Sequence, residues 1–250
     1  MIYLKTKEEI KIMAKAGQIA ASALRQIAKN VRPGVKVNDL DKIADEKIKS
    51  FGAESSFKKV NGYQYTICTT PNDWVVHGIP ENYVLKEGDI LGVDLGAYFE
   101  GFHSDLAYTF PVGKVSDERR KFLATGEKAL QAAVKKVKIG GRIGDISETI
   151  QHTVERAGYS VVKELVGHGV GRNLHEDPLV PGIGKKDTGE KIEEGIVLAV
   201  EVIYNQGKPQ VQLLPDGWSI ATKDGLLAGL FETTVAATKK KPLVLTKYVA

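Results

Sequence analysis

The chain has 250 residues, of which 42% are apolar and 26% are charged, and its formal net charge is +4. This is the composition of a folded globular protein with a substantial core, and so small a charge does not indicate a nucleic-acid-binding protein. The single cysteine excludes an intramolecular disulfide. Because the charged start is unlike a signal peptide and no apolar run reaches the roughly 18 residues of a membrane helix, we expect a cytoplasmic protein without a membrane segment.

Apolar residues at spacings of three and four predict a first helix over residues 7–30. Two more helices are predicted inside residues 31–54 and 137–160, and a counterpart of the first over 117–137. Apolar segments bounded by turn residues predict strands over residues 65–70, 73–78, 89–98, 102–110, 196–205, 209–215 and 229–238. This mixture predicts the α+β class.

The chain repeats a pattern at a nearly constant offset. Residues 31–54 match residues 137–160 at an offset of 106, and each copy has a glycine turn, an aspartate near a helix start and a glycine after the helix. Residues 87–94 match residues 194–201 at an offset of 107, and both segments end in a carboxylate. We interpret the chain as one domain, residues 1–250, made of two related halves at roughly 1–115 and 116–250. Generic helix-then-strand similarity is the alternative.

Four carboxylates interrupt or adjoin predicted strands that are otherwise apolar: Asp94, Asp105, Glu201 and Glu232. A turn cap or a buried salt bridge would explain any one of them, since a buried carboxylate needs a partner. No matching set of lysine or arginine interrupts the same strands. A shared cation of multiple charge is therefore the simplest neutraliser of all four.

Three of the five histidines, His77, His168 and His175, lie in or near glycine-containing segments, where the backbone can approach a site closely. His103 and His152 are interpreted as structural or solvated. Four carboxylates with one histidine suit two divalent first-row metal ions, and a single cysteine excludes a multi-thiolate zinc site. Since two such ions can hold a hydroxide and polarise a carbonyl or phosphoryl oxygen, the residues alone predict a dinuclear metallohydrolase.

At these residues the sequence resembles the type I methionine aminopeptidases, which belong to the creatinase-like pita-bread fold family. The resemblance covers essentially the whole chain. It implies the pita-bread fold, with two pseudo-symmetric halves around a central antiparallel sheet. The motifs that carry it are His-Gly-Ile-Pro at 77–80, Asp94 and Asp105 eleven residues apart, Gly-His-Gly-Val-Gly-Arg at 167–172, His175, and Glu201 and Glu232 31 residues apart.

The resemblance also implies an activity: removal of the N-terminal methionine from nascent proteins and peptides, with a preference for a small second residue. It implies two divalent metal ions per chain, of Co, Mn, Fe or Zn. By position, the implied metal ligands are Asp94, Asp105, His168, Glu201 and Glu232.

The remaining implied roles concern the substrate. His77 and His175 would face it, Glu201 would also shuttle a proton, and a methionine pocket would be lined by Tyr63, Cys68, Leu174 and Trp218. Ordinary core packing is the alternative for those four. The chain departs from the family pattern at three positions that concern substrate range more than reaction class: Val202 in place of proline, Leu174 in place of an aromatic residue, and Thr233 in place of histidine.

Two other functions stay open. Relatives that cleave Xaa-Pro bonds, such as aminopeptidase P or prolidase, usually carry a large N-terminal domain, whereas this chain begins almost at once with the predicted catalytic fold. A catalytically inactive relative could act as a binding module, but such proteins typically lose metal ligands. The resemblance further implies a monomer that meets nascent chains and binds no specific nucleic acid. The run Lys239–Lys241 could attract ribosomal RNA transiently, although a solvated tail is the favoured explanation.

Overall fold

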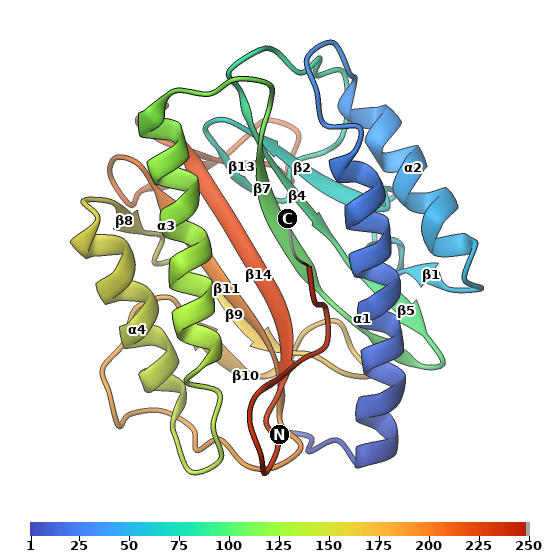
Figure 1. The fold of residues 1–250 in the computed structure, drawn as a ribbon, viewed down its shortest axis with the longest axis vertical. Coiled ribbons are helices and arrows are strands. Elements are labelled where there is room, and N and C mark those ends of the chain that lie inside the picture. Colours follow the sequence, from blue (N-terminus) through green and yellow to red (C-terminus); the bar gives the residue numbers. More distant parts are fainter. Residues whose placement is uncertain (249–250) are drawn as a thin grey trace.

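A central antiparallel sheet organises the molecule, and the helices cover one of its faces (Figure 1). The computed structural model describes residues 1–248. The strands follow the order β10-β9-β11-β14-β7-β4-β2, with β15 paired to β14 and β8 paired to β11. Their bounds are β2 Ile67–Pro71, β4 Ile90–Leu95, β7 Leu106–Pro111, β8 Ser160–Val161, β9 Val166–Gly169, β10 Glu176–Pro181, β11 Val197–Asn205, β14 Ala228–Ala236 and β15 Leu243–Val244.

Two small sheets and a 3-10 helix, η1 (Phe57–Lys59), flank this sheet. One small sheet has the order β1-β5-β6 and the other the order β12-β13-β3. Their bounds are β1 Glu54–Ser55, β3 Trp74–Val76, β5 Ala97–Phe99, β6 Phe102–His103, β12 Val211–Leu213 and β13 Ile220–Thr222.

The helices form two pairs, α1 (Lys7–Ala28) with α2 (Val37–Lys49) and α3 (Asp117–Val134) with α4 (Ile143–Arg156). The starts of α2 and α4 are 106 positions apart, which is the offset of the sequence repeat. Gly52 and Gly158 are the glycines expected after these helices, and their φ values of 70° and 90° place both in the left-handed conformation that glycine favours at a helix end. No helix within residues 1–248 has the length and apolarity required to cross a membrane.

Strand alternation decides which side chains face the helices. On β11, Val200 and Val202 pack in the core with Phe122 of α3, so Glu201 between them points to the opposite face. On β4, Val93 and Leu95 pack against α1 and place Asp94 on that same opposite face. The sheet therefore has one apolar face under the helices and one face that collects carboxylates.

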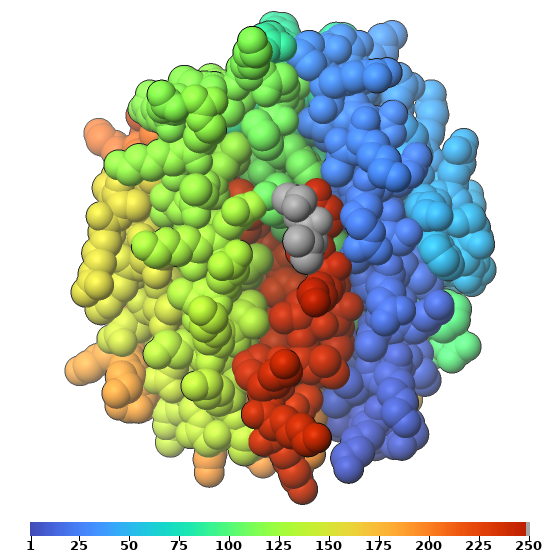
Figure 2. Space-filling model, in the orientation of Figure 1, coloured from blue at the N-terminus to red at the C-terminus, as the bar shows by residue number. Residues whose placement is uncertain are grey.

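The C-terminal segment fills the groove between α1 and α3. In Figure 2 it forms the red band between the blue and green helices. Gly17 of α1 allows this contact, because a Cβ there would lie 2.4 Å from the carbonyl oxygen of Leu245. The C-terminal segment thus links the two helix pairs, in addition to the sheet beneath them.

The strand predictions agree with the structure in most places and are incomplete in others. The segments 89–98 and 102–110 each divide into two strands, and a hairpin turn joins β5 to β6 between them. β9 and β10 were not predicted, because residues 166–169 contain two glycines and residues 176–181 contain two prolines, and both residue types disfavour strands in isolation. Neighbouring strands require glycine at positions 167 and 169. A Cβ on Gly167 would lie 2.5 Å from the Ala199 carbonyl oxygen, and a Cβ on Gly169 would lie 2.2 Å from the Asp177 carbonyl oxygen.

Candidate metal centre

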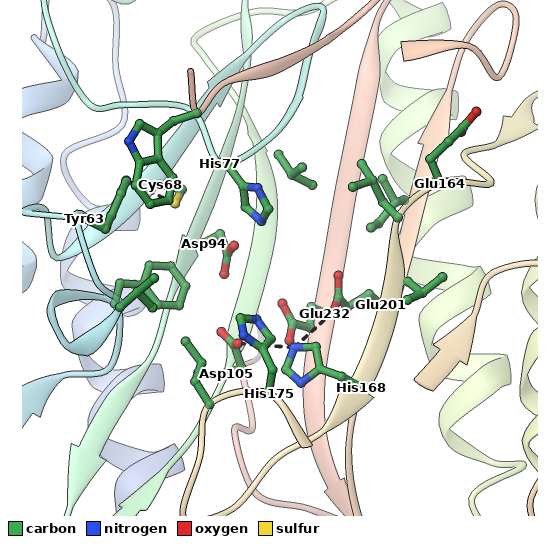
Figure 3. A pocket seen from close by; sticks show the side chains of 18 residues that line it. Tyr63, Cys68, His77, Asp94, Asp105, Glu164, His168, His175, Glu201 and Glu232 are labelled. Carbon is green, nitrogen blue, oxygen red and sulfur yellow. Dashed lines mark hydrogen bonds and ion pairs between the residues drawn. The ribbon is translucent and has the colours of Figure 1, made fainter. Parts of the chain in front are cut away.

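A cavity of about 340 Å³ opens on the carboxylate-bearing face of the sheet (Figure 3). A volume in this range is typical of small-molecule sites. All eleven residues that were expected to bind metal or substrate line it: Tyr63, Cys68, His77, Asp94, Asp105, His168, Leu174, His175, Glu201, Trp218 and Glu232.

The sheet register places three of the carboxylates in a single row across four strands. Asp94 on β4 faces Ala107 on β7, Ala107 faces Glu232 on β14, and Glu232 faces Glu201 on β11. Asp105 precedes Ala107 by two residues and points into the same cavity, as Figure 3 shows. Because like charges directly opposite on a sheet repel one another, this row calls for a counter-charge.

His168 completes the group from β9. Its Nδ1 lies 2.8 Å from the carbonyl oxygen of Gly169, which can only accept, so Nδ1 carries the proton and Nε2 keeps a lone pair. That Nε2 lies 3.4 Å from Glu201 Oε1 and 3.8 Å from Asp105 Oδ2. Burial, together with neighbouring His175, lowers the pKa of His168 to about 4, so the imidazole is neutral at pH 7. The Nε2 lone pair thus faces the carboxyl oxygens of Glu201 and Asp105.

The carboxyl pKa values are all raised, mainly by burial. The pKa of Asp94 rises to about 7, and those of Asp105, Glu201 and Glu232 rise well above their ordinary values, with repulsion from neighbouring carboxylates as a further cause. Asp94 Oδ1 and Glu232 Oε1 are buried without a hydrogen-bond partner. No lysine or arginine of residues 1–248 lines the cavity.

These observations fit a divalent cation site. Asp105, His168 and Glu232 each offer one ligand atom, and these atoms all lie within 4.8 Å of one another. Oxygen ligands with one imidazole suit divalent first-row metals, and the bond from Nδ1 of His168 to a backbone carbonyl is the usual support of a metal-binding histidine. Glu201 and Asp94 adjoin this group on its two sides (Figure 3).

The other histidines divide as the sequence indicated. His77 and His175 are solvent-exposed at the cavity, and the ring centroid of His175 lies 4.4 Å from that of His168. Burial lowers the pKa of both, so each imidazole is neutral at any pH above the ordinary histidine pKa. His103 is buried and His152 is exposed on α4, and neither lines the cavity.

An apolar cluster forms one end of the cavity. Tyr63, Cys68 and Leu174 are buried in it with Phe57, and Trp218 packs against them, its ring centroid 5.1 Å from that of Tyr63. The Tyr63 hydroxyl donates to the Ile67 carbonyl at 2.8 Å, and burial raises the pKa of the Cys68 thiol. The cluster is an apolar wall beside the carboxylates, of a kind that accommodates a thioether side chain.

Sequence reasoning missed seven other lining residues. Ile203 carried a readable signal, since it follows Glu201 by two positions on a strand and must share its face. The others become visible only when distant segments meet. The seven are Phe57, Val60, Val76, Glu164, Leu165, Val166 and Ile203.

Comparison with known proteins identifies the family. The model of metallopeptidase family M24 matches residues 11–238. The chain belongs to this family. It is 44% identical over 246 residues to a methionine aminopeptidase of Clostridium perfringens, covering 98% of this chain and 99% of the relative. Methionine aminopeptidase 1 of Bacillus subtilis is 43% identical over 247 residues, covering 99% of this chain and all of the relative.

Solved structures agree with this family membership. The methionine aminopeptidase of Thermotoga maritima superposes with a TM-score of 0.97 at 40% identity, covering 99% of this chain and all of that chain. The likeness confirms the expected pita-bread fold. A prolidase of Pyrococcus horikoshii has a TM-score of 0.80 at 22% identity and is covered over 64% of its length, which shows the shared fold alone. The family is one of metallopeptidases, so the chain is a metal-dependent peptidase, among the methionine aminopeptidases.

Proposed function

We propose that this enzyme removes the N-terminal methionine from nascent proteins and peptides, and prefers substrates with a small second residue. The observation that carries the proposal is that the carboxylate row and the apolar cluster share one cavity. The cluster of Tyr63, Cys68, Leu174 and Trp218 would hold the methionine side chain. Branched side chains of Val76, Leu165 and Ile203 line another part of the cavity, and a small second residue would fit beside them.

Asp94, Asp105, His168, Glu201 and Glu232 would hold two divalent ions, of Co, Mn, Fe or Zn. Divalent ions supply two effects when bound in such a site: they lower the pKa of water and polarise the carbonyl of the scissile peptide. The buried carboxylates and the neutral His168 have the donor chemistry that such ions require.

The protein's own groups supply proton transfer and orientation. Glu201 lines the cavity, and its carboxylate would accept a proton from the attacking water and return it to the leaving amine. His175, exposed at the cavity, would donate a hydrogen bond to the oxygen on which negative charge develops. His77, also exposed there, would contact the backbone that follows the scissile bond. The apolar cluster excludes water from the methionine side chain.

The test is peptide hydrolysis combined with metal analysis. We expect the purified protein with Mn²⁺ or Co²⁺ to release methionine from Met-Ala-Ser and to leave Ala-Pro-Phe intact. The Glu201→Gln variant should lose about 10²- to 10⁴-fold in turnover, the usual contribution of a general base. Glu164→Gln is the matched control, because Glu164 is an exposed carboxylate that lines the same cavity outside the ligand set.

Two results would decide against the proposal. Near-normal turnover of Glu201→Gln at full metal content would remove Glu201 from proton transfer. Cleavage of Ala-Pro-Phe in preference would assign the site to Xaa-Pro substrates, and cleavage of neither peptide without metal binding would favour a binding module. We further propose that the enzyme acts as a cytoplasmic monomer.

A further inference from the structure

The N-terminal arm, residues 1–6, reaches the loop that carries Leu174 and His175. The backbone N–H of Lys5 donates to the carbonyl of Gly195 at 2.7 Å. Its Nζ lies 2.6 Å from Oε2 of Glu176, the residue that follows His175. The two side chains are 4% and 5% exposed, so this ion pair is buried.

The second oxygen of Glu176 orders the loop itself. Glu176 Oε1 accepts from the backbone N–H of Asn173 at 3.0 Å. The N–H of Gly171 donates to the Asn173 carbonyl at 3.0 Å, and the N–H of His103 donates to the Gly171 carbonyl at 2.8 Å. Residues 171–175 are therefore held from both sides, by Glu176 and by β6.

The ion pair packs closely against Gly171. A Cβ on Gly171 would lie 2.5 Å from Lys5 Cε and 2.7 Å from Glu176 Oε1, so any larger residue there would displace the pair. A buried ion pair is weak evidence for stability, since well-packed apolar residues often stabilise as well or better. What an apolar pair cannot supply is the acceptor for the Asn173 amide. This favours a role in setting the geometry of the loop.

We propose that Lys5 and Glu176 are positioning residues, which hold loop 171–175 so that His175 and Leu174 meet the substrate in the correct geometry. This proposal rests on the aminopeptidase function proposed above. His175 packs edge-on against His168, with ring centroids 4.4 Å apart, and Leu174 belongs to the apolar cluster. A displaced loop would therefore disturb both the oxyanion contact and the methionine wall.

The experiment compares three variants of the full chain with a matched control. Lys5→Met leaves Glu176 unpaired. The double variant Lys5→Met/Glu176→Met makes the pair apolar, whereas Lys5→Met/Glu176→Gln makes it neutral and keeps an acceptor for the Asn173 amide. Arg172→Met is the control, since it breaks an exposed ion pair of 3.0 Å between the same loop and Glu9 of α1.

Four quantities are measured: kcat and KM for Met-Ala-Ser, bound metal, melting temperature, and hydrogen exchange of the amides in residues 171–176. We expect Lys5→Met to lower kcat by about ten- to a hundredfold, the usual cost of misplacing a group by about 1 Å, at unchanged metal content and with faster exchange. The Met/Met variant should regain melting temperature but neither kcat nor exchange protection. The Met/Gln variant should regain part of kcat and part of the exchange protection. The kcat of Arg172→Met should stay within about twofold of wild type.

The proposal is overturned if kcat follows melting temperature through the series, or if Lys5→Met leaves kcat and exchange at wild-type values. If wild type itself fails to hydrolyse Met-Ala-Ser, it is the aminopeptidase function that fails. The exchange comparison still decides in that case whether the ion pair holds the loop.

Discussion

Asp94 should make the metal-free protein less stable as the pH rises toward neutrality. Burial raises its pKa to about 7 from an ordinary value of 3.8. Between these two values the folded protein holds a proton that the unfolded chain has lost, so this group's stabilising contribution is complete below pH 3.8 and is lost as the pH rises to about 7. A difference of about 3 pH units corresponds to about 4 kcal/mol of unfolding free energy.

We therefore expect the metal-free Asp94→Asn variant to be more stable than metal-free wild type at pH 8, by up to about 4 kcal/mol. The difference should shrink steadily toward pH 4, where wild-type Asp94 is protonated in the folded state. His168, whose pKa is lowered to about 4, titrates in both proteins and so largely cancels in the comparison. Added Mn²⁺ should reverse the order at pH 8, since the wild-type site binds the ion more tightly.

The assay is urea denaturation of chelated protein from pH 4 to pH 8, followed by circular dichroism. Asp224→Asn serves as the control, because a hydrogen bond from the Lys208 amide is the main cause of the lowered pKa of Asp224. A carboxylate of that kind stabilises above its unfolded pKa and loses its effect as the pH falls, so its removal should give no gain at pH 8. The reasoning is refuted if Asp94→Asn is less stable than wild type at pH 8, or if their difference does not change with pH.

Three further outcomes are expected. Gly126→Ala should cost about 1–3 kcal/mol in urea denaturation, because its Cβ would lie 2.3 Å from Cδ2 of Phe231; a negligible loss would mean that the ring can move aside. Trp218→Ala should lower kcat/KM for Met-Ala-Ser by about tenfold or more through the loss of the pocket wall, and unchanged kinetics would place the methionine elsewhere. A triple alanine variant of Lys239–Lys241 should cosediment with ribosomes as wild type does, since these lysines lie not on a tail but on the exposed turn between β14 and β15, where Lys239 pairs with Glu194 at 3.5 Å; weaker binding by the variant at low salt would assign the lysines to RNA contact.

The sequence revealed the candidate site because its signal is local. A carboxylate such as Glu201 within an apolar strand is visible without any structure, and so is the glycine context of His168. The row from Asp94 through Glu232 to Glu201 could not be predicted, because strand register depends on pairings between distant segments. The Lys5–Glu176 pair joins residues 171 positions apart and leaves no local pattern.

The fold shows the same division. The glycines after α2 and α4 were predictable, since each ends a helix within its own segment. β9 was not, because Gly167 and Gly169 are explained only by the backbone atoms that crowd them. Strand propensity describes the conformation of a residue's own backbone, whereas these two positions require glycine because a neighbouring strand lies so close.

The pairing of β7 with β14 has a consequence for how the protein matures. This pairing joins β4, which carries Asp94, and β7, which begins just after Asp105, to β14 and β11, which carry Glu232 and Glu201. Neither half of the chain holds the whole ligand set, so a fragment of either half should bind divalent ions weakly. Acquisition of the metal must then wait for the longest-range contacts of the sheet, which are the slowest to form during folding. Tight metal binding would therefore report completed folding of the entire chain.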